Sequence, residues 1–294
     1  MKKVIRIGSR ESQLAVIQSK LVMQAIKKAH PELELELITM KTTGDKILDR
    51  NLDQIGGKGL FVKELDKALL NGDIDLSVHS LKDLPMEISK DIPLIGFSKR
   101  EDPRDALILK EGISLPLTGG IVGSSSRRRM IQLKNMYPNI ESKGIRGNVQ
   151  TRLRKLEEED YIATILAAAG LNRLGMGHVI SKVFSTEEMI PAAGQGILAL
   201  QGRSGENYDF VNCFLDKNGE VAAKAERSFV KTLDGGCSSP IAAYAEISGN
   251  EIKLRGLYYH EPAEDFSIGT ITGGISEAEK LGETLALRLK KEWA

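Results

Sequence analysis

The chain has 294 residues, of which 28% are charged, and its formal net charge is +1. This length allows about two or three domains with real cores, and the balanced charge excludes the global basic field that drives nonspecific nucleic-acid binding. The first apolar run is short and contains Arg6, so we expect neither a signal peptide nor a membrane span. Cys213 and Cys237 show neither disulfide nor metal-site spacing, which favours a cytoplasmic protein.

The chain opens with a predicted strand over residues 4–8 and a helix through residue 29. Leu14, Ile17, Leu21 and Ala25 recur at helical spacing and are the expected buried face. Between the two elements, Arg10 and Ser12 fall where a helix amino terminus and free backbone N–H groups favour an anion.

A strand over 33–37, a helix from Phe61 that Asn71-Gly72 ends, and a strand over 74–78 follow. Residues 45–59 lack periodicity and are glycine-rich at one end, so we predict a mobile lid over a site, with an ordinary surface loop as the alternative. Asp83 comes just after the third strand, which suits a cleft. It could equally belong to an Asx-turn beside Lys82.

The charged, proline-bearing segment 99–105 separates strands over 94–97 and 106–109 and predicts a hinge between domains. Beyond it, strands and helices alternate again. The predicted elements of this second unit are a strand over 121–123, a helix opening at 124–129, a helix over 149–156 and a strand over 162–166. A strand over 197–200 could return the chain to the first unit, which would give two lobes with paired crossings.

The last part of the chain predicts a smaller α+β domain. Its predicted elements are a helix with Val221, Ala225, Phe229 and Leu233 on one face, a hairpin over 241–258 turning at Gly249-Asn250, a strand near 266–270 and an amphipathic helix over 278–289. Gly235-Gly236 ends the first helix and places Cys237 on a loop between rigid elements. Such a thiol suits a covalent anchor, or it packs as a small hydrophobe, as most free cysteines do.

Six arginines lie in or beside turns that lead from a strand into a helix: Arg10, Arg128, Arg129, Arg146, Arg152 and Arg173. The arginine fork binds carboxylate or phosphate in bidentate fashion, so this placement favours a polyanionic ligand over solvated surface charge. The triplet at 127–129 has no interleaved aromatics, which disfavours nucleic acid.

We find no Walker phosphate loop, dinucleotide fingerprint, His-Glu-x-x-His or Gly-x-Ser-x-Gly. The four histidines are scattered and read as structural or solvated. His79, close to Asp83, is the one that merits closer inspection.

The sequence resembles the porphobilinogen deaminase (hydroxymethylbilane synthase) family over essentially its whole length. The residues that carry the resemblance are 8–10 with Ser12, 57–65, 79–85, Ser125-Ser126 with Arg128-Arg129, 145–149 with 151–153, 168–171 with 173–175, 194–196 and 235–237.

The resemblance implies a transferase that adds four porphobilinogens head to tail, releases ammonia at each step and finally frees hydroxymethylbilane. It implies a dipyrromethane cofactor joined to Cys237 through a thioether. Asp83 would be the catalytic carboxylate, stabilising the electron-poor azafulvenium that forms when the substrate loses ammonia. The surrounding cations should favour its ionised form.

The residues implied in binding the cofactor are Cys237, Asp83, Lys82, Ser80, Ser124, Ser125, Ser126, Arg128, Arg129, Arg146 and Gly147. Those implied in binding substrate carboxylates are Arg10, Ser12, Arg146, Arg152, Arg173 and Gln195. Arg127 stands where the family usually has leucine, which leaves open whether it contacts ligand or solvent.

The implied fold is α/β, with two lobes like those of periplasmic binding proteins, built on mixed sheets, and a third, smaller α+β domain carrying Cys237. The expected domains are 1–98 with 194–215, then 104–190, and finally 217–294. We expect a monomer whose partner is its small-molecule substrate, with no metal, nucleic acid or membrane. The runner-up function is a non-enzymatic two-lobed anion receptor, which a purified chain without a covalent adduct would support.

Overall fold

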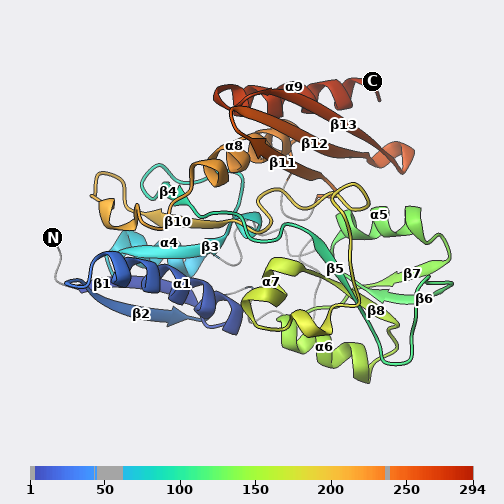
Figure 1. Cartoon of the computed structure of the whole chain (residues 1–294), viewed down its shortest axis with the longest axis horizontal. Helices are drawn as coiled ribbons and strands as arrows, with labels where there is room; N and C mark the ends of the chain where they lie inside the picture. The colour runs from blue at the N-terminus through green and yellow to red at the C-terminus, as the bar shows by residue number, and fades with distance from the viewer. Residues whose placement is uncertain (1–3, 43, 45–61, 236–238, 294) are drawn as a thin grey trace.

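A computed structural model describes residues 4–42, 44, 62–235 and 239–293. These residues form two five-stranded sheets and one three-stranded sheet, which Figure 1 shows at the left, right and top. The predicted lid at 45–59 and Cys237 lie outside the described residues.

The first sheet has the order β2-β1-β3-β10-β4. Its strands are β1 (Val4–Arg10), β2 (Glu34–Met40), β3 (Leu76–Ser80), β4 (Leu94–Phe97) and β10 (Leu198–Gly202). β1 is parallel to β2 and β3, whereas β10 is antiparallel to β3 and β4. The chain therefore returns to this sheet through β10, as its sequence predicted.

Helices cover both faces of the first sheet. On one face, Val22 and Ile26 of α1 (Gln13–Ala29) share a core with Ile5 and Ile7 of β1. On the other, α4 (Lys63–Asn71) packs Leu65 and Leu69, and Gly72 ends it at φ 75°. This left-handed conformation is one that glycine adopts without strain, which is why Asn71-Gly72 predicted the helix end.

The predicted apolar face of α1 was wrong by one position. The residues buried along the helix include Ala15, Val22 and Ile26, whereas Leu21 is 38% exposed. Two apolar stripes run along this helix, and the sheet buries the one that contains Val22 and Ile26. Leu14 of the other stripe faces Gly170 in the second lobe.

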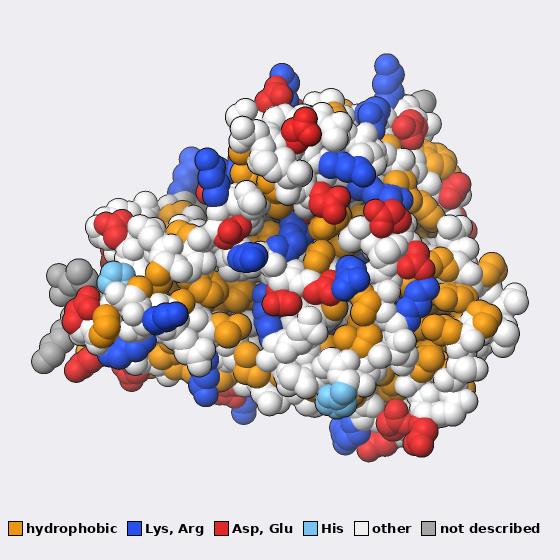
Figure 2. Space-filling model, viewed as in Figure 1, with side chains coloured by type: hydrophobic (Ala, Val, Ile, Leu, Met, Phe, Trp, Pro, Cys, Tyr) orange, Lys and Arg blue, Asp and Glu red, His pale blue; other side chains and the backbone are white. Residues whose placement is uncertain are grey.

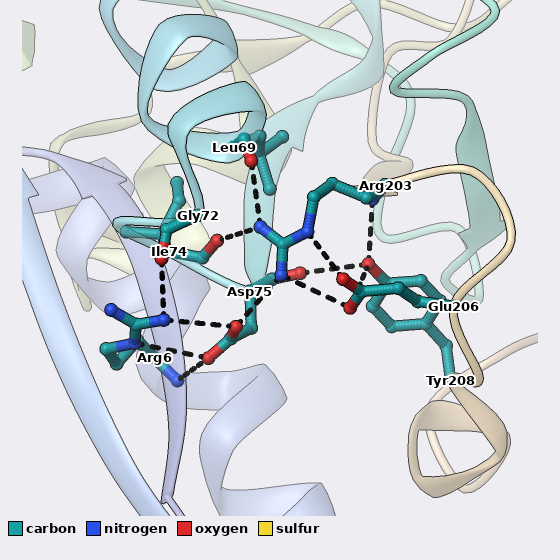
Figure 3. A network of polar contacts seen from close by, with 8 residues as sticks. All are labelled: Arg6, Leu69, Gly72, Ile74, Asp75, Arg203, Glu206 and Tyr208. Carbon is teal, nitrogen blue, oxygen red and sulfur yellow. Dashed lines mark hydrogen bonds and ion pairs between the residues drawn. The ribbon is translucent and has the colours of Figure 1, made fainter. Parts of the chain in front are cut away.

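A polar network holds the far end of this lobe together (Figure 3). The buried carboxylate of Asp75 pairs with Arg6 at 3.3 Å and with Arg203 at 3.0 Å. Arg203 also donates to the carbonyls of Leu69 and Ile74, at 2.8 and 2.6 Å. Because Arg203 directly follows β10, the network fastens the returning strand to β1, β3 and the end of α4.

The second sheet repeats this plan in the order β7-β6-β8-β5-β9. Its strands are β5 (Asp105–Leu109), β6 (Gly120–Gly123), β7 (Ile140–Lys143), β8 (Ala163–Ala167) and β9 (Lys182–Val183). β6 is parallel to β7 and β8, and β5 is antiparallel to β8 and β9. Edge strands β7 and β9 were not foreseen, because β7 is exposed at three of its four residues and β9 has only two.

Helices α5 (Arg127–Met136), α6 (Val149–Glu158) and α7 (Ala168–Arg173) flank the second sheet. Met130 and Leu133 of α5 pack on one face, and Leu156 of α6 with Leu171 of α7 on the other. Segment 98–104 and the stretch before β10 join this sheet to the first, so the chain crosses twice between the lobes.

The third sheet is the antiparallel meander β11-β12-β13. Its elements are β11 (Ala242–Ser248), β12 (Glu251–His260), β13 (Asp265–Gly274), α8 (Lys217–Thr232) and α9 (Ala278–Lys291). Short 3-10 turns complete the described part of the fold: η1 (Leu81–Asp83), η2 (Gly177–Val179), η3 (Asp209–Val211), η4 (Glu261–Ala263) and η5 (Ile275–Glu277). Both helices share one core with the sheet, which confirms the expected α/β fold with mixed sheets and a smaller α+β part.

Candidate active site between the lobes

The carboxyl ends of parallel strands from both five-stranded sheets supply the site residues. β1 ends at Arg10 and β3 at Ser80, whereas β6 leads into the serines before α5 and β8 leads into α7. This is the edge at which α/β sheets bind ligands. Figure 2 shows basic and acidic side chains together at the centre of the viewed face, where the three parts of the molecule meet.

Two buried leucines anchor the turn that carries Asp83 and leave the Asp83 side chain exposed to solvent. Leu81 and Leu84 are each 1% exposed, and the Leu84 N–H donates to the Leu81 carbonyl at 3.2 Å, which closes the η1 turn. The Leu81 N–H also donates to the carbonyl of Ile197 at 3.0 Å. Asp83 itself is exposed and interacts electrostatically with Lys82 and Arg152. No described residue donates a hydrogen bond to its carboxylate, which argues against the Asx-turn alternative.

Lys82 lies beside this carboxylate. Its Nζ donates to Oε1 of Gln195 at 3.2 Å. Desolvation lowers the pKa of Lys82 to about 8, with Arg129 and Arg128 adding to the effect and Asp83 and Asp105 opposing it. Lys82 of the first lobe therefore lies close enough to Arg128, Arg129 and Asp105 of the second lobe to interact with their charges.

Asp105 is the buried partner of both expected cofactor arginines. Its Oδ2 accepts from Arg128 Nη1 at 2.8 Å and its Oδ1 from Arg129 Nε at 2.9 Å. All three side chains are almost completely buried. Burial would raise the pKa of Asp105, but the charges of Arg128 and Arg129 reverse this and hold the pKa well below its usual value.

Backbone carbonyls complete the coordination of these two guanidinium groups. Arg128 Nη1 donates to the carbonyl of Ile190 at 2.7 Å, and Arg129 Nη1 to that of Ile165 at 3.0 Å. The expected pair of carboxylate-binding arginines is thus present, but it is already fixed by an internal anion. Desolvation lowers the pKa of Arg128, with Asp105 opposing the shift.

Arg146 and Arg152 approach from the loop and first turn of α6. Arg152 Nε donates to the Gly147 carbonyl at 2.8 Å, and Gly147 has a φ of 119°, a conformation open to glycine. Desolvation lowers the pKa of Arg152 to about 10; Arg129 and Arg146 add to the shift and Asp83 opposes it. These residues therefore form one electrostatic cluster.

Arg10 and Arg173 border the same region. Arg173 Nη2 donates to the Gly196 carbonyl at 2.7 Å, which ties α7 to the second crossing. Arg10 ends β1 and acts on His79, whose pKa is lowered to about 4 mainly by burial and further by Arg10, with a hydrogen bond to the Gln201 side chain opposing. His79 Nε2 lies 2.8 Å from Ser77 Oγ, so it is a structural histidine.

Four of the five expected serines use their hydroxyl groups in internal hydrogen bonds, and Ser126 takes part through its backbone N–H. Ser12 caps α1 by accepting from the Ala15 N–H at 3.4 Å, and Ser80 Oγ accepts from Gln18 at 3.0 Å. Ser124 Oγ accepts from the Ser126 N–H at 3.2 Å, and Ser125 Oγ donates to the Ile145 carbonyl at 3.0 Å. These contacts shape the turns at the helix starts.

Helix α8 connects the cysteine-bearing segment to the Asp83 turn. Arg227 Nη2 donates to the carbonyls of Pro85 and Met86, at 2.7 and 3.0 Å. Buried Glu226 accepts from Arg100, from the Gly194 N–H and from the Ala245 N–H, at 2.6, 2.7 and 2.7 Å. The helix that ends just before Cys237 is therefore anchored to η1 and to both crossings.

Sequence reasoning assigned no role in the site to Asp105, Glu226 and Arg227. One signal for Asp105 was available, namely a charged residue at the start of an apolar strand. The other two look like ordinary polar positions on an amphipathic helix.

Arg127 contacts the third part of the molecule. Its two terminal nitrogens donate to the two carboxylate oxygens of Glu261, each at 2.7 Å, and its guanidinium lies 5.6 Å from the ring centroid of Tyr259. The question left open by the sequence is thus answered by an ion pair within the protein.

The arrangement favours binding of carboxylates beside the exposed carboxylate of Asp83. The basic side chains of this cluster, which are Lys82, Arg128, Arg129, Arg146 and Arg152, outnumber its two acids, Asp83 and Asp105. Among the described residues, no group of His, Cys, Asp and Glu could hold a metal ion. In the part of the chain that the structure describes, no helix is long and apolar enough to span a membrane.

Solved structures with some likeness include the periplasmic aliphatic sulphonate binding protein SsuA from Escherichia coli, with a TM-score of 0.43 and 12% identity over 80% of this chain and 71% of that chain. The methionine binding protein MetQ gives a TM-score of 0.47 and 14% identity over 76% and 94%. Both TM-scores are below 0.5, so the fold class rests on the sheet topology.

Two family models match. The "Porphobilinogen deaminase, dipyromethane cofactor binding domain" matches residues 5–209, and the "Porphobilinogen deaminase, C-terminal domain" matches residues 221–291. A porphobilinogen deaminase of Ruminiclostridium cellulolyticum is 52% identical over 288 residues, 98% of each chain. One of Nostoc sp. is 40% identical over 301 residues, 100% of this chain and 93% of the relative. The chain therefore belongs to the porphobilinogen deaminase family, whose enzymes polymerise porphobilinogen into hydroxymethylbilane on a dipyrromethane cofactor.

Proposed function

We propose that Asp83 is the catalytic carboxylate of this transferase and that Cys237 anchors its dipyrromethane. The observation that carries the proposal is the single exposed acid on η1, surrounded by basic side chains from both lobes. A carboxylate so placed stabilises positive charge on the pyrrole when porphobilinogen loses ammonia.

The residues around Asp83 fit a polycarboxylate cofactor. Arg128 is held through Nη1, and its Nε and Nη2 donate to no described residue, so these N–H groups remain for a ligand. Lys82 supplies a further cation. When bound, the dipyrromethane provides the pyrrole carbon to which each new ring is joined.

Within this scheme, Lys82, Arg128, Arg129, Arg146 and the backbone of Gly147 bind cofactor carboxylates, helped by the serines at 80 and 124–126. The proposed substrate residues are Arg10, Ser12, Arg146, Arg152, Arg173 and Gln195. Arginine forks fix the direction of each carboxylate as well as its charge, which orients the pyrrole ring.

Intact mass spectrometry tests the anchor. The purified chain should carry the mass of a covalent dipyrrole, Cys237→Ser should lack it, and the matched control Cys213→Ser should retain it. An unmodified wild-type chain that binds carboxylates without turnover would instead support an anion receptor.

Substitution of the acid tests the catalytic role. Asp83→Asn keeps the side-chain shape but removes the charge, so we expect a folded protein with at least about 100-fold lower turnover. A turnover rate equal to the wild type would contradict the assignment.

We further propose three domains, 1–98 with 194–215, 104–190 and 217–294, in a cytoplasmic monomer without nucleic-acid or membrane partners. The distinct cores of the two five-stranded sheets support the boundaries between the first two domains, whereas the core of the third also contains Leu81, Leu84 and Ala199 of the first. Light scattering coupled to size exclusion should give the mass of one chain, and a dimer mass would refute this part.

A further inference from the structure

A continuous chain of buried and partly buried polar contacts crosses from the first lobe to the second. Lys82 Nζ donates to Gln195 Oε1 at 3.2 Å, and Gln195 Nε2 donates to Asp105 Oδ1 at 3.0 Å. Asp105 then accepts from Arg128 and Arg129. Lys82 follows β3, Gln195 lies in the second crossing and Asp105 ends the first, so both crossings take part.

The orientation of the Gln195 amide is determined by its partners. Its Nε2 donates both to Asp105 and to the carbonyl of Pro103, the latter at 2.6 Å. Both partners are acceptors only, so the NH₂ group must face them. The amide oxygen is then directed to Lys82, which has donors only, and Gln195 couples Asp105 to Lys82 in one geometry.

Asp105 also fixes the rotation of the arginine pair. It holds Arg128 through one terminal nitrogen, and it holds Arg129 through Nε at 2.9 Å and Nη2 at 2.8 Å. The two guanidinium groups are consecutive in sequence yet share one carboxylate. Without that anion, two buried cations would face each other, each held only by a backbone carbonyl, that of Ile190 or Ile165.

We infer that Asp105 is a positioning residue of the reaction, which orients Arg128 and Arg129 directly and Lys82 through Gln195. This inference rests on the proposed roles of these three cations in binding carboxylates. Asp105 itself touches no ligand in this scheme, because its carboxylate is buried and fully used by internal donors.

Orientation and charge predict opposite effects when Asp105 is neutralised. If Asp105 only balances charge, Asp105→Asn leaves a more cationic site and tighter carboxylate binding. If Asp105 positions the cations, binding weakens despite the added positive charge, because the forks lose their direction. The sign of the change separates the two.

The experiment compares Asp105→Asn with Asp102→Asn in the purified enzyme. Asp102 is the matched control, since it lies three residues earlier and pairs with its neighbour Arg104 at 2.7 Å. We expect Asp105→Asn to raise KM for porphobilinogen about tenfold, because Asp105 also fixes Gln195, a proposed substrate residue, and tenfold is the value of one charge-assisted hydrogen bond; kcat should change much less. Its cofactor-loaded fraction, read by intact mass, should fall, and Asp102→Asn should match the wild type.

A second readout follows Lys82. The rate of its acetylation as a function of pH, measured on the Lys82 peptide by mass spectrometry, gives its titration midpoint. Asp105 favours the charged lysine, so Asp105→Asn should move the midpoint to lower pH. The Asp102→Asn midpoint should not move.

Two outcomes would overturn the inference: a KM for Asp105→Asn that is unchanged or lower, or an unmoved Lys82 midpoint. If Asp105→Asn does not fold, Gln195→Met removes the hydrogen bonds of Gln195 with Lys82, Asp105 and Pro103 but leaves the ion pairs of Asp105 with Arg128 and Arg129, and an unmoved Lys82 midpoint in that variant has the same meaning. Wild-type turnover in Asp83→Asn would instead overturn the proposed function, so the two failures are distinguishable.

Discussion

The ion pair between Arg127 and Glu261 joins the first turn of α5 to the tip of the third sheet, and its removal should loosen that junction without affecting chemistry. The perturbations are Arg127→Leu, Glu261→Gln and the double variant. Because Arg127 is committed to Glu261 and Tyr259, we expect all three variants to keep wild-type turnover and cofactor loading.

The magnitude follows from geometry and exposure. Both contacts are 2.7 Å and bidentate, but the side chains are 46% and 57% exposed. Exposed pairs contribute about 0.2–1 kcal/mol, and the bidentate geometry with the stacked Tyr259 places this pair near the upper end. We therefore expect a coupling free energy of roughly 0.5–1 kcal/mol, or about 1–3 °C in Tm.

The assay is a double-mutant cycle on thermal or urea unfolding, at low salt and in about 1 M NaCl, where screening should remove most of the coupling. The hydrogen bonds from Arg127 lower the pKa of Glu261. The coupling is therefore present at neutral pH, above the unfolded pKa of Glu261, and is lost as pH falls through its folded pKa.

The matched control is the pair of Arg154 and Glu158 within α6, whose closest atoms are 3.9 Å apart. Its coupling should be smaller, about 0.3 kcal/mol. A coupling near zero at low salt for Arg127 and Glu261, or a loss of turnover in Arg127→Leu, would refute the reasoning.

Further predictions concern the surroundings of Asp83. Gly194→Ala should displace Leu81 and with it the η1 turn, because Gly194 has φ 75° and a Cβ would lie 2.6 Å from Leu81 Cγ; we expect about 2–4 kcal/mol lost in unfolding experiments and reduced turnover, and an unchanged melting curve would contradict this. His79, with a pKa of about 4, should contribute about 3 kcal/mol of stability at neutral pH that disappears as pH falls from 6.5 toward 4; His79→Gln should lose this pH dependence in urea titrations. Lys82 loses its charge above about pH 8, so the fraction of chains that acquire the cofactor, read by intact mass, should fall there, whereas Lys82→Arg should keep this fraction constant to higher pH. Arg146→Leu should weaken carboxylate binding, and unchanged cofactor assembly and elongation would count against its role. Residues 45–59 remain a predicted lid, and hydrogen exchange slower with substrate than without is the expected result.

Much of the fold could be predicted from the sequence, because strand and helix periods and glycine stops act locally. The return strand β10, the end of α4 at Gly72 and the hairpin β11–β12 are where these patterns placed them. The grouping of arginines at helix starts was also visible, since a strand followed by a helix brings such turns to one edge of a sheet.

Only the tertiary structure decided which partners these residues meet. Nothing along the chain indicates that Asp105 lies between Arg128 and Arg129, or that Arg127 turns to Glu261 across 134 positions. The buried face of α1 was likewise chosen by the sheet from two apolar stripes. Sequence periodicity specifies what a segment can bury, whereas the pairing of buried charges depends on contacts between segments far apart in the chain, which only packing brings together.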